Sequence, residues 1–289
     1  MAEESLGLLI YGPAGSGKTS LGLTGPTPTL VLDAEQASKF IPRKEKVSWN
    51  PLTDPEPPVY DGTWKYCVVR IDKWDIADKV MKYLKARRHP FKTVLLDSVT
   101  EIVVKAKEEI NGRNQFKVQH WGELSSNMGY MLRDLRDEAS SEYSPIEVLC
   151  IIAVEQEHIK ANIAGEVESR KVEPYLEGGV RKIISFLYDI TAHITLVEEM
   201  ADRSNPGAGY ITNQYFFTGK NPEITAKSRV GRILPSTIVN PTLTGLLHGI
   251  FPPDDVPETP SPQPDPVPQE SVPEPRKSKS SGLPSLPTN

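Results

Sequence analysis

The chain has 289 residues, 38% of them hydrophobic, and a formal net charge of −5, so it can bury the core of one large domain or two small ones. This balance excludes a polycationic nucleic-acid coat but is compatible with a local basic groove. The two cysteines, Cys67 and Cys150, match no zinc or C-x-x-C spacing, and no apolar run is long enough to span a bilayer. Glu3 and Glu4 stand where a secretory signal would need basic residues, so we expect a cytoplasmic protein with no membrane association.

The first chemical motif is GPAGSGKT at Gly12–Thr19, which fits the phosphate-binding pattern G-x-x-x-x-G-K-[ST]. An apolar run resembling a buried strand precedes it, and a helix-compatible segment follows. Its glycines allow successive backbone N–H groups to converge on phosphate oxygens, Lys18 is expected to reach the β- and γ-phosphates, and Thr19 to bind Mg²⁺. We therefore predict ATP and Mg²⁺ as ligands, with a nucleotide site made of Gly12, Pro13, Ala14, Gly15, Ser16, Gly17, Lys18, Thr19 and Ser20.

The next stretch is predicted to alternate strands and helices. Thr29–Leu32 is predicted to be a short buried strand that ends in the acidic sequence Asp33-Ala34-Glu35. Pro42–Asp61 is rich in proline and polar residues, so we expect a surface excursion with little regular structure. Tyr66–Ile71 is predicted to be a strand, and the four-residue spacing of apolar positions predicts an amphipathic helix at Asp75–Arg88.

An apolar strand ending in an acid, Thr93–Asp97, has the form of a Walker B element. At the carboxyl end of a parallel strand beside the phosphate loop, Asp97 could hold a Mg²⁺-bound water; the alternative is that it caps the next helix. A polar segment, Glu109–Gln119, then separates helical stretches, and a second amphipathic helix is predicted at Gly122–Ala139.

The rest of the folded part is predicted to contribute further strands. Val148–Val154 is strongly apolar and is followed by a polar loop, and three more segments, Ile183–Tyr188, Ala192–Val197 and Gln214–Thr218, are expected to complete the sheet.

The composition changes near the C-terminus, so we predict one folded domain at residues 1–251 and a disordered tail at residues 252–289. Twelve of those last 38 residues are proline and few large apolar residues remain. The tail is either simply solvated or docks a protein partner.

Several of these motifs resemble the RecA recombinase family. VLDAEQA (residues 31–37) resembles its second-strand motif and LLDSVTEI (residues 95–102) its Walker B. The resemblance implies an α/β fold with a mostly parallel central sheet flanked by helices, and it implies that Glu35 polarises the attacking water, the alternative being a loop cap. IIAVEQ (residues 151–156) resembles the strand that ends in a phosphate-sensing glutamine, here Gln156, although Glu155 replaces an amide.

Two further segments extend the resemblance. GGVRKIISFLYDITAHITL (residues 178–196) resembles the Gly-Gly helix and strand that follow the family's second DNA-binding loop. AKSRVGR (residues 226–232) resembles the finger loop of hexameric helicases such as DnaB, which implies that Lys227 and Arg229 reach the nucleotide of a neighbouring subunit in a homo-oligomer. The alternative is a solvated pair of cations. Overall, the chain is similar to phage-encoded RecA-like nucleotide-binding proteins, some of which anneal single strands.

The same resemblance directs attention to two possible sites for single-stranded DNA. The first, residues 111–120, offers Arg113 and Lys117 for phosphates and Phe116 for base stacking. The second, residues 157–177, is net acidic, unlike a tight DNA-binding loop. We therefore expect a Mg²⁺-dependent ATPase that acts on single-stranded DNA in recombination, annealing or replication. Alternatives are a nucleotide-controlled switch that docks a partner through its tail, and a helicase or helicase-loading motor.

Overall fold

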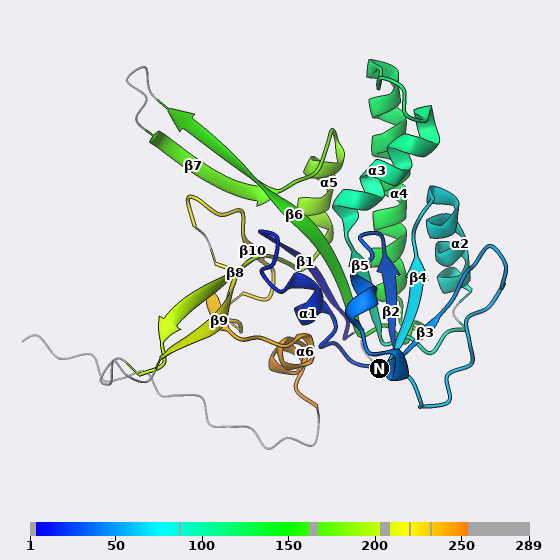
Figure 1. Cartoon of the computed structure of the whole chain (residues 1–289), viewed down its shortest axis with the longest axis horizontal. Coiled ribbons are helices and arrows are strands. Elements are labelled where there is room, and N and C mark those ends of the chain that lie inside the picture. Colours follow the sequence, from blue (N-terminus) through cyan, green and yellow to red (C-terminus); the bar gives the residue numbers. More distant parts are fainter. Residues whose placement is uncertain are drawn as a thin grey trace, which may run out of the picture. The chain divides into compact units, whose positions relative to one another are not determined.

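A computed structural model describes residues 4–86, 88–161, 167–202, 209–219, 221–231 and 233–253. In these residues eleven strands join in one sheet, in the order β11-β9-β8-β1-β6-β5-β2-β4-β3, with β10 paired to β8 and β7 paired to β6 (Figure 1). The strands are β1 (Leu6–Gly12), β2 (Thr29–Asp33), β3 (Lys46–Ser48), β4 (Tyr66–Arg70), β5 (Thr93–Asp97), β6 (Val148–Ala161), β7 (Val167–Pro174), β8 (Ile190–Met200), β9 (Tyr210–Phe217), β10 (Lys227–Ser228) and β11 (Thr237–Val239).

The run of strands from β8 to β3 is parallel throughout, and β9 and β11 extend it in antiparallel fashion at one edge. Its central strands are continuous apolar runs because helices cover both faces. The helices are α1 (Lys18–Gly22), α2 (Trp74–Lys85), α3 (Val99–Asn111), α4 (Val118–Ala139), α5 (Val180–Leu187) and α6 (Leu243–Ile250), with short 3₁₀ helices η1 (Ala37–Phe40) and η2 (Arg43–Glu45).

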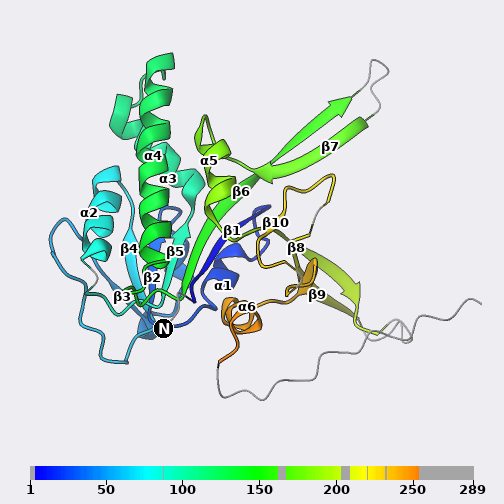
Figure 2. The ribbon, with the colours of Figure 1, turned by 180° about the vertical axis from the view of Figure 1, so that it is seen from behind.

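Two apolar clusters place these helices on the two faces of the sheet. One cluster joins alternate residues of β1, such as Leu9, to apolar side chains of α2, α3, α4 and α5. The other joins the intervening residues, such as Leu8 and Ile10, to α1 and α6. Figure 2, the view from behind, has α4 in front of the sheet. The predicted α/β class, with a mostly parallel sheet flanked by helices, is confirmed.

Three local predictions are corrected. The excursion at Pro42–Asp61 contains η2 and the edge strand β3, because Trp49 is buried and anchors it to the core. The segment Ile183–Tyr188, predicted as a strand, belongs largely to α5, in which Val180, Ile184 and Leu187 face the core with helical spacing, as the RecA resemblance had implied. The polar stretch after Val154 continues β6 to Ala161 and pairs with β7, so much of it is a β-hairpin and not an open loop.

The described residues form one compact unit that ends at Pro253. The predicted disorder of the tail concerns residues that, beyond Pro253, lie outside the described part of the chain. None of the helices described is both long enough and apolar enough to cross a membrane.

Candidate nucleotide-binding site

The loop between β1 and α1 has the backbone that phosphate binding requires. Gly15 and Gly17 have φ angles of 79° and 82°, a left-handed region in which side chains are strained. Gly12 is packed so closely against β8 that a Cβ there would lie 2.2 Å from the carbonyl oxygen of Ile194. Ser16 is 2% exposed, and its Oγ has no hydrogen-bond partner among the described residues. A glycine-lined concavity with a spare buried hydroxyl fits phosphate oxygens.

Lys18 lies across this loop. Its Nζ donates hydrogen bonds to the carbonyl oxygens of Gly12 (2.8 Å) and Pro13 (2.7 Å). Burial lowers the pKa of Lys18, and the negative charges of Glu35, Asp97 and Glu155 oppose that shift. The ammonium group therefore rests on backbone carbonyls within the electrostatic influence of three carboxylates, where it would be placed to meet an anionic ligand.

Thr19 and Asp97 are in direct contact. Thr19 Oγ1 donates a hydrogen bond of 2.6 Å to Asp97 Oδ2, from the first turn of α1 to the carboxyl end of β5. Asp97 is 2% exposed, and burial raises its pKa to about 6, although the Thr19 hydrogen bond acts in the opposite direction. A hydroxyl and a carboxylate side by side form the oxygen-donor set that Mg²⁺ prefers. The helix-cap role considered for Asp97 belongs instead to Ser98, whose Oγ accepts from Glu101 N at 3.4 Å.

Glu35 is held against the same strand end. Ser98 Oγ donates a hydrogen bond to the Glu35 carboxylate. The backbone N–H groups of Ala34 and Glu35 both donate to the carbonyl oxygen of Asp97, at 2.7 and 3.3 Å. The structure thus brings Glu35 and Asp97 together across the ends of β2 and β5, facing the loop that contains Lys18.

At the end of β6, Gln156 and Glu155 have separate partners. The Gln156 side-chain amide donates to Glu173 on β7 at 3.0 Å, so it is engaged by the hairpin. Glu155 lies 2.9 Å from His193 Nε2 on β8 and contributes to the charge around Lys18. Neither Glu155 nor His193 was predicted as a site residue. The one sequence feature that pointed to Glu155 is that it replaces the amide of the recombinase motif.

Lys227 and Arg229 lie near the amino-terminal end of β8, away from the carboxyl ends that hold the nucleotide site. β10 pairs with Ile190 and Thr191, the first residues of β8, which are level with Leu8 and Leu9 of β1. The phosphate loop begins at Gly12, three to four residues or about 10 to 13 Å further along β1. Arg229 Nη1 is 3.8 Å from the Asp189 carboxylate, and Lys227 Nζ is 5.9 Å from the centre of the Phe186 ring. The chain therefore does not bring these cations to its own phosphate loop.

The three DNA-binding candidates lie between α3 and α4. Arg113 and Lys117 are exposed, whereas Phe116 is partly buried and packs edge-on against Trp121, with the ring centres 5.0 Å apart. Lys107 Nζ lies 5.4 Å from both ring centres and 2.6 Å from the Glu177 carboxylate. Phe116 is thus part of a basic and aromatic cluster that touches the segment after the β6–β7 hairpin.

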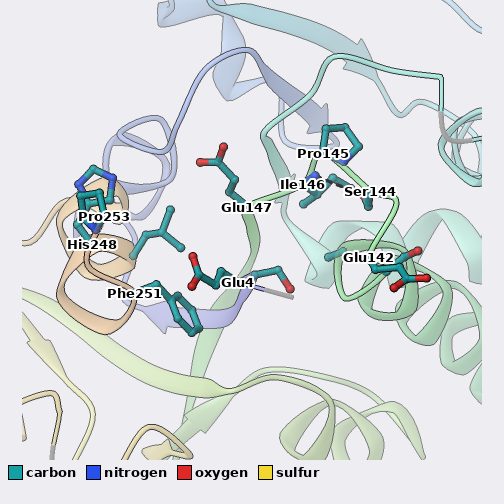
Figure 3. Close-up of a pocket in the computed structure, with 13 residues that line it drawn as sticks. Glu4, Glu142, Ser144, Pro145, Ile146, Glu147, His248, Phe251 and Pro253 are labelled. Carbon is teal, nitrogen blue, oxygen red and sulfur yellow. Dashed lines mark hydrogen bonds between the residues drawn. The ribbon is translucent and has the colours of Figure 1, made fainter. Parts of the chain in front are cut away.

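A pocket of about 380 Å³ lies at the amino-terminal ends of β1 and β6 (Figure 3). Residues just before β1, the segment before β6 and the C-terminal end of α6 line it, among them Glu4, Glu147, His248 and Phe251. None of the predicted site residues lines this pocket, so it is separate from the phosphate loop.

A glycine cradle, a half-buried lysine and a threonine–aspartate pair at the carboxyl edge of a parallel sheet define a P-loop nucleoside triphosphatase. The chain belongs to the AAA domain family, whose profile matches residues 4–230, and it is therefore a P-loop ATPase that binds and hydrolyses nucleotide. No curated protein matches the chain. Among solved structures, the chain is similar to the flagellar accessory protein FlaH from Methanocaldococcus jannaschii, at 9% identity and a TM-score of 0.42, over 84% of this chain and 88% of that one.

Proposed function

We propose that this ATPase is Mg²⁺-dependent and acts on single-stranded DNA in recombination, annealing or replication, as its resemblance to phage-encoded RecA-like proteins implies. The observation that carries this proposal is the course of α3. The helix begins at Val99, directly after Asp97 and Ser98, and ends at the basic loop that contains Arg113. Its 13 residues span about 20 Å, so one rigid element connects the nucleotide site to the candidate DNA contact.

In the reaction we assign Glu35 to accept a proton from the attacking water. Its carboxylate is oriented by Ser98, which keeps one oxygen engaged and leaves the other available. Lys18 would move from its present carbonyl partners to the β- and γ-phosphates. Thr19 and Asp97 would hold the Mg²⁺, which when bound neutralises charge developing on the phosphates.

The loop between α3 and α4 is linked to the β6–β7 hairpin, and this supports a shared DNA surface. The Lys107–Glu177 ion pair joins α3 to the segment after β7. Trp121 packs on Gly178 so tightly that a Cβ on that glycine would lie 3.0 Å from the indole ring. We infer that Arg113 and Lys117 bind DNA phosphates, and that base stacking requires Phe116 to turn out of its contact with Trp121.

The position of Lys227 and Arg229 supports an oligomer in this proposal. They lie too far along the sheet to reach their own nucleotide, and so could act only on the nucleotide of a neighbouring subunit. We include this trans role in the proposal, with Gln156 linking the nucleotide site to the hairpin through Glu173. The expected assembly is a homo-oligomer, whether ring or filament.

Binding of a fluorescein-labelled oligo(dT), followed by fluorescence anisotropy over a series of salt concentrations, tests the DNA assignment. We expect affinity to fall linearly on logarithmic axes, with Arg113→Ala and Lys117→Ala each reducing the slope by about 0.7. Glu123→Gln, an exposed change on α4, is the control and should leave the slope unaltered. Lack of binding at low salt, or equal slopes in all variants, would contradict the assignment and favour a nucleotide-controlled switch.

A further inference from the structure

A glutamine far away in the sequence contacts the phosphate loop. Gln214 lies on β9, 198 residues after Ser16, and its Nε2 donates a hydrogen bond of 2.9 Å to the Ser16 carbonyl oxygen. A Cβ on Gly17 would lie 2.4 Å from the same nitrogen. The amide group therefore fits against the loop only because residue 17 is a glycine, and Gly17 is constrained by this contact as well as by its positive φ.

This contact fixes the orientation of one peptide group. The peptide that joins Ser16 to Gly17 is planar, and in a trans peptide the C=O and N–H bonds point in opposite directions. With the carbonyl oxygen held by Gln214, the N–H of Gly17 must face away from β9. We propose that Gln214 is a positioning residue of the nucleotide site, which keeps the Gly17 N–H directed at the phosphates of the bound nucleotide.

Gln214 is itself held in place by the segment before α6. Its backbone N–H donates to Asn240 Oδ1 at 2.8 Å, and the Asn240 N–H donates back to the Gln214 carbonyl oxygen at 2.7 Å. Asn240 has a φ of 49°, one of two positive values among non-glycine residues of the described part of the chain. Asn240 tolerates this left-handed conformation, and its two reciprocal hydrogen bonds fix the backbone of Gln214 in position.

The same segment also binds the other end of the phosphate-loop helix. Leu243 N donates to Thr24 Oγ1 at 2.8 Å, and Thr244 Oγ1 donates to the Thr24 carbonyl oxygen at 2.8 Å. The loop and its short helix are thus fixed through Gln214 before α1 and through Thr24 after it. Asn240 and α6 lie beyond residue 230, where the family match ends, so this clamp is an addition to the matched domain.

The role of Gln214 predicts a loss of nucleotide affinity and not a loss of chemistry. Without the amide, the Ser16 peptide can rotate and the Gly17 N–H is no longer held ready for the phosphate. One preorganised hydrogen bond corresponds to about a tenfold change in affinity. Because the Gly17 N–H contacts phosphate in both the ground and transition states, KM should rise about tenfold while kcat changes by less than about twofold.

The experiment measures binding of a fluorescent ADP analogue and steady-state ATP hydrolysis for Gln214→Leu and Gln214→Glu in the full chain. Gln214→Leu removes the donor. Gln214→Glu keeps the size and shape of the side chain but places a carboxylate, which cannot donate, beside the phosphates, so we expect it to bind more weakly than Gln214→Leu. Thr212→Ala, two residues earlier on the same strand face and exposed, is the matched control and should bind like the parent protein.

Melting temperatures without nucleotide separate positioning from folding, because the parent and the variants should agree when no ligand is bound. If Gln214→Leu melts early, the isosteric Gln214→Glu variant decides the question. Parent-like affinity in both folded variants would overturn the proposal. So would a fall in kcat with unchanged KM, since that pattern belongs to a residue acting only in the transition state.

Discussion

The nucleotide site and the β6–β7 hairpin both lie beyond the carboxyl ends of the parallel strands, and both are rich in charge, but their charges are organised differently. In the nucleotide site Asp97 is buried at the end of β5 and accepts a hydrogen bond from Thr19 in the first turn of α1, so this charge is held by a contact between two elements. In the hairpin, Glu173 gathers Arg181, Lys171 and His158 around one carboxylate, mostly on the exposed surface. Burial alone would raise the pKa of Glu173, but the basic side chains of Arg181, Lys171 and His158 together outweigh burial and lower it.

This difference shows where a sequence motif determines geometry. Buried strand ends leave a side chain few directions, so a motif on such a strand implies a contact. On an exposed hairpin, the strand pairing decides which charges neutralise each other, and only the remaining charges are available to a ligand. The nucleotide site should therefore respond to single substitutions by large factors, and the hairpin by small ones.

The largest expected effect is that of Lys18→Ala. Its ammonium donates hydrogen bonds to two backbone carbonyls, so the fold should remain while the positive charge at the phosphates is lost. ATP hydrolysis should fall about a thousandfold. Steady-state phosphate release checks this, with exposed Lys44→Ala as a control that should retain parental turnover. Near-parental activity in Lys18→Ala would show that the phosphate loop does not take part in hydrolysis.

Glu35→Gln should separate binding from hydrolysis. The glutamine oxygen can still accept the hydrogen bond from Ser98, but the amide cannot accept a proton from water. Hydrolysis should fall about a hundredfold with nucleotide affinity retained. Single-turnover hydrolysis and equilibrium binding measure the two quantities, with exposed Glu109→Gln as the matched control. Unchanged turnover in Glu35→Gln would show that another carboxylate, such as Glu155, accepts the proton.

A substitution at His89, outside the nucleotide site and the hairpin, should change stability without changing activity. Burial lowers the pKa of His89 from 6.5 to about 4, and neither ring nitrogen has a hydrogen-bond partner among the described residues. Between those values the unfolded state binds a proton that the folded state does not, so stability is lost as pH falls. At pH 5 this loss is about 2 kcal/mol relative to pH 7.

His89→Phe should abolish that loss, because it preserves the stacking on Phe91 and cannot take up a proton. Urea unfolding of both proteins at the two pH values measures the difference. The variant should have a smaller drop in the free energy of unfolding between pH 7 and pH 5, with ATP turnover unaltered at pH 7. An equal drop in the free energy of unfolding in both proteins would mean that groups other than His89 cause the loss of stability at acid pH.

The smallest effect is expected from Glu173→Gln on the hairpin. Removing this carboxylate takes away a negative charge beside Arg181 and Lys171, so single-stranded DNA should bind about threefold more tightly and with a steeper salt dependence. Anisotropy titration of oligo(dT) measures it. Weaker binding would mean that Glu173 is needed to hold the hairpin in its binding conformation.

Much of the fold could be predicted because its central strands carry their own signal. The central residues of β2 and β5 are apolar and both strands terminate in acids, so the sequence predicted both strands to within one residue and a mostly parallel sheet. The pairing of β2 with β5, which sets Glu35 beside Asp97, was not predicted. The α5 segment was predicted as a strand because five of the six residues from Ile183 to Tyr188 are apolar or aromatic, which conceals the helical spacing of Val180, Ile184 and Leu187. Strand β3 was missed because three residues at a sheet edge give no periodic pattern.

The parts of the site that escaped prediction depend on pairing between distant segments. Gln214 reaches Ser16 because β9 follows β8 along the sheet edge, and no local pattern encodes that contact. Gln156 could be located from its motif, but its bond to Glu173 depends on the register of the β6–β7 pairing.

The central claim is that DNA at the loop after α3 controls hydrolysis at the phosphate loop. Its most direct test is steady-state ATP hydrolysis with Mg²⁺, with and without single-stranded DNA, at low and moderate salt, using Lys18→Ala as the blank. The account predicts that DNA stimulates turnover, that stimulation declines with salt, and that the Arg113→Ala/Lys117→Ala double variant loses it while retaining its DNA-independent rate. Turnover that is the same with and without DNA under all these conditions would contradict it.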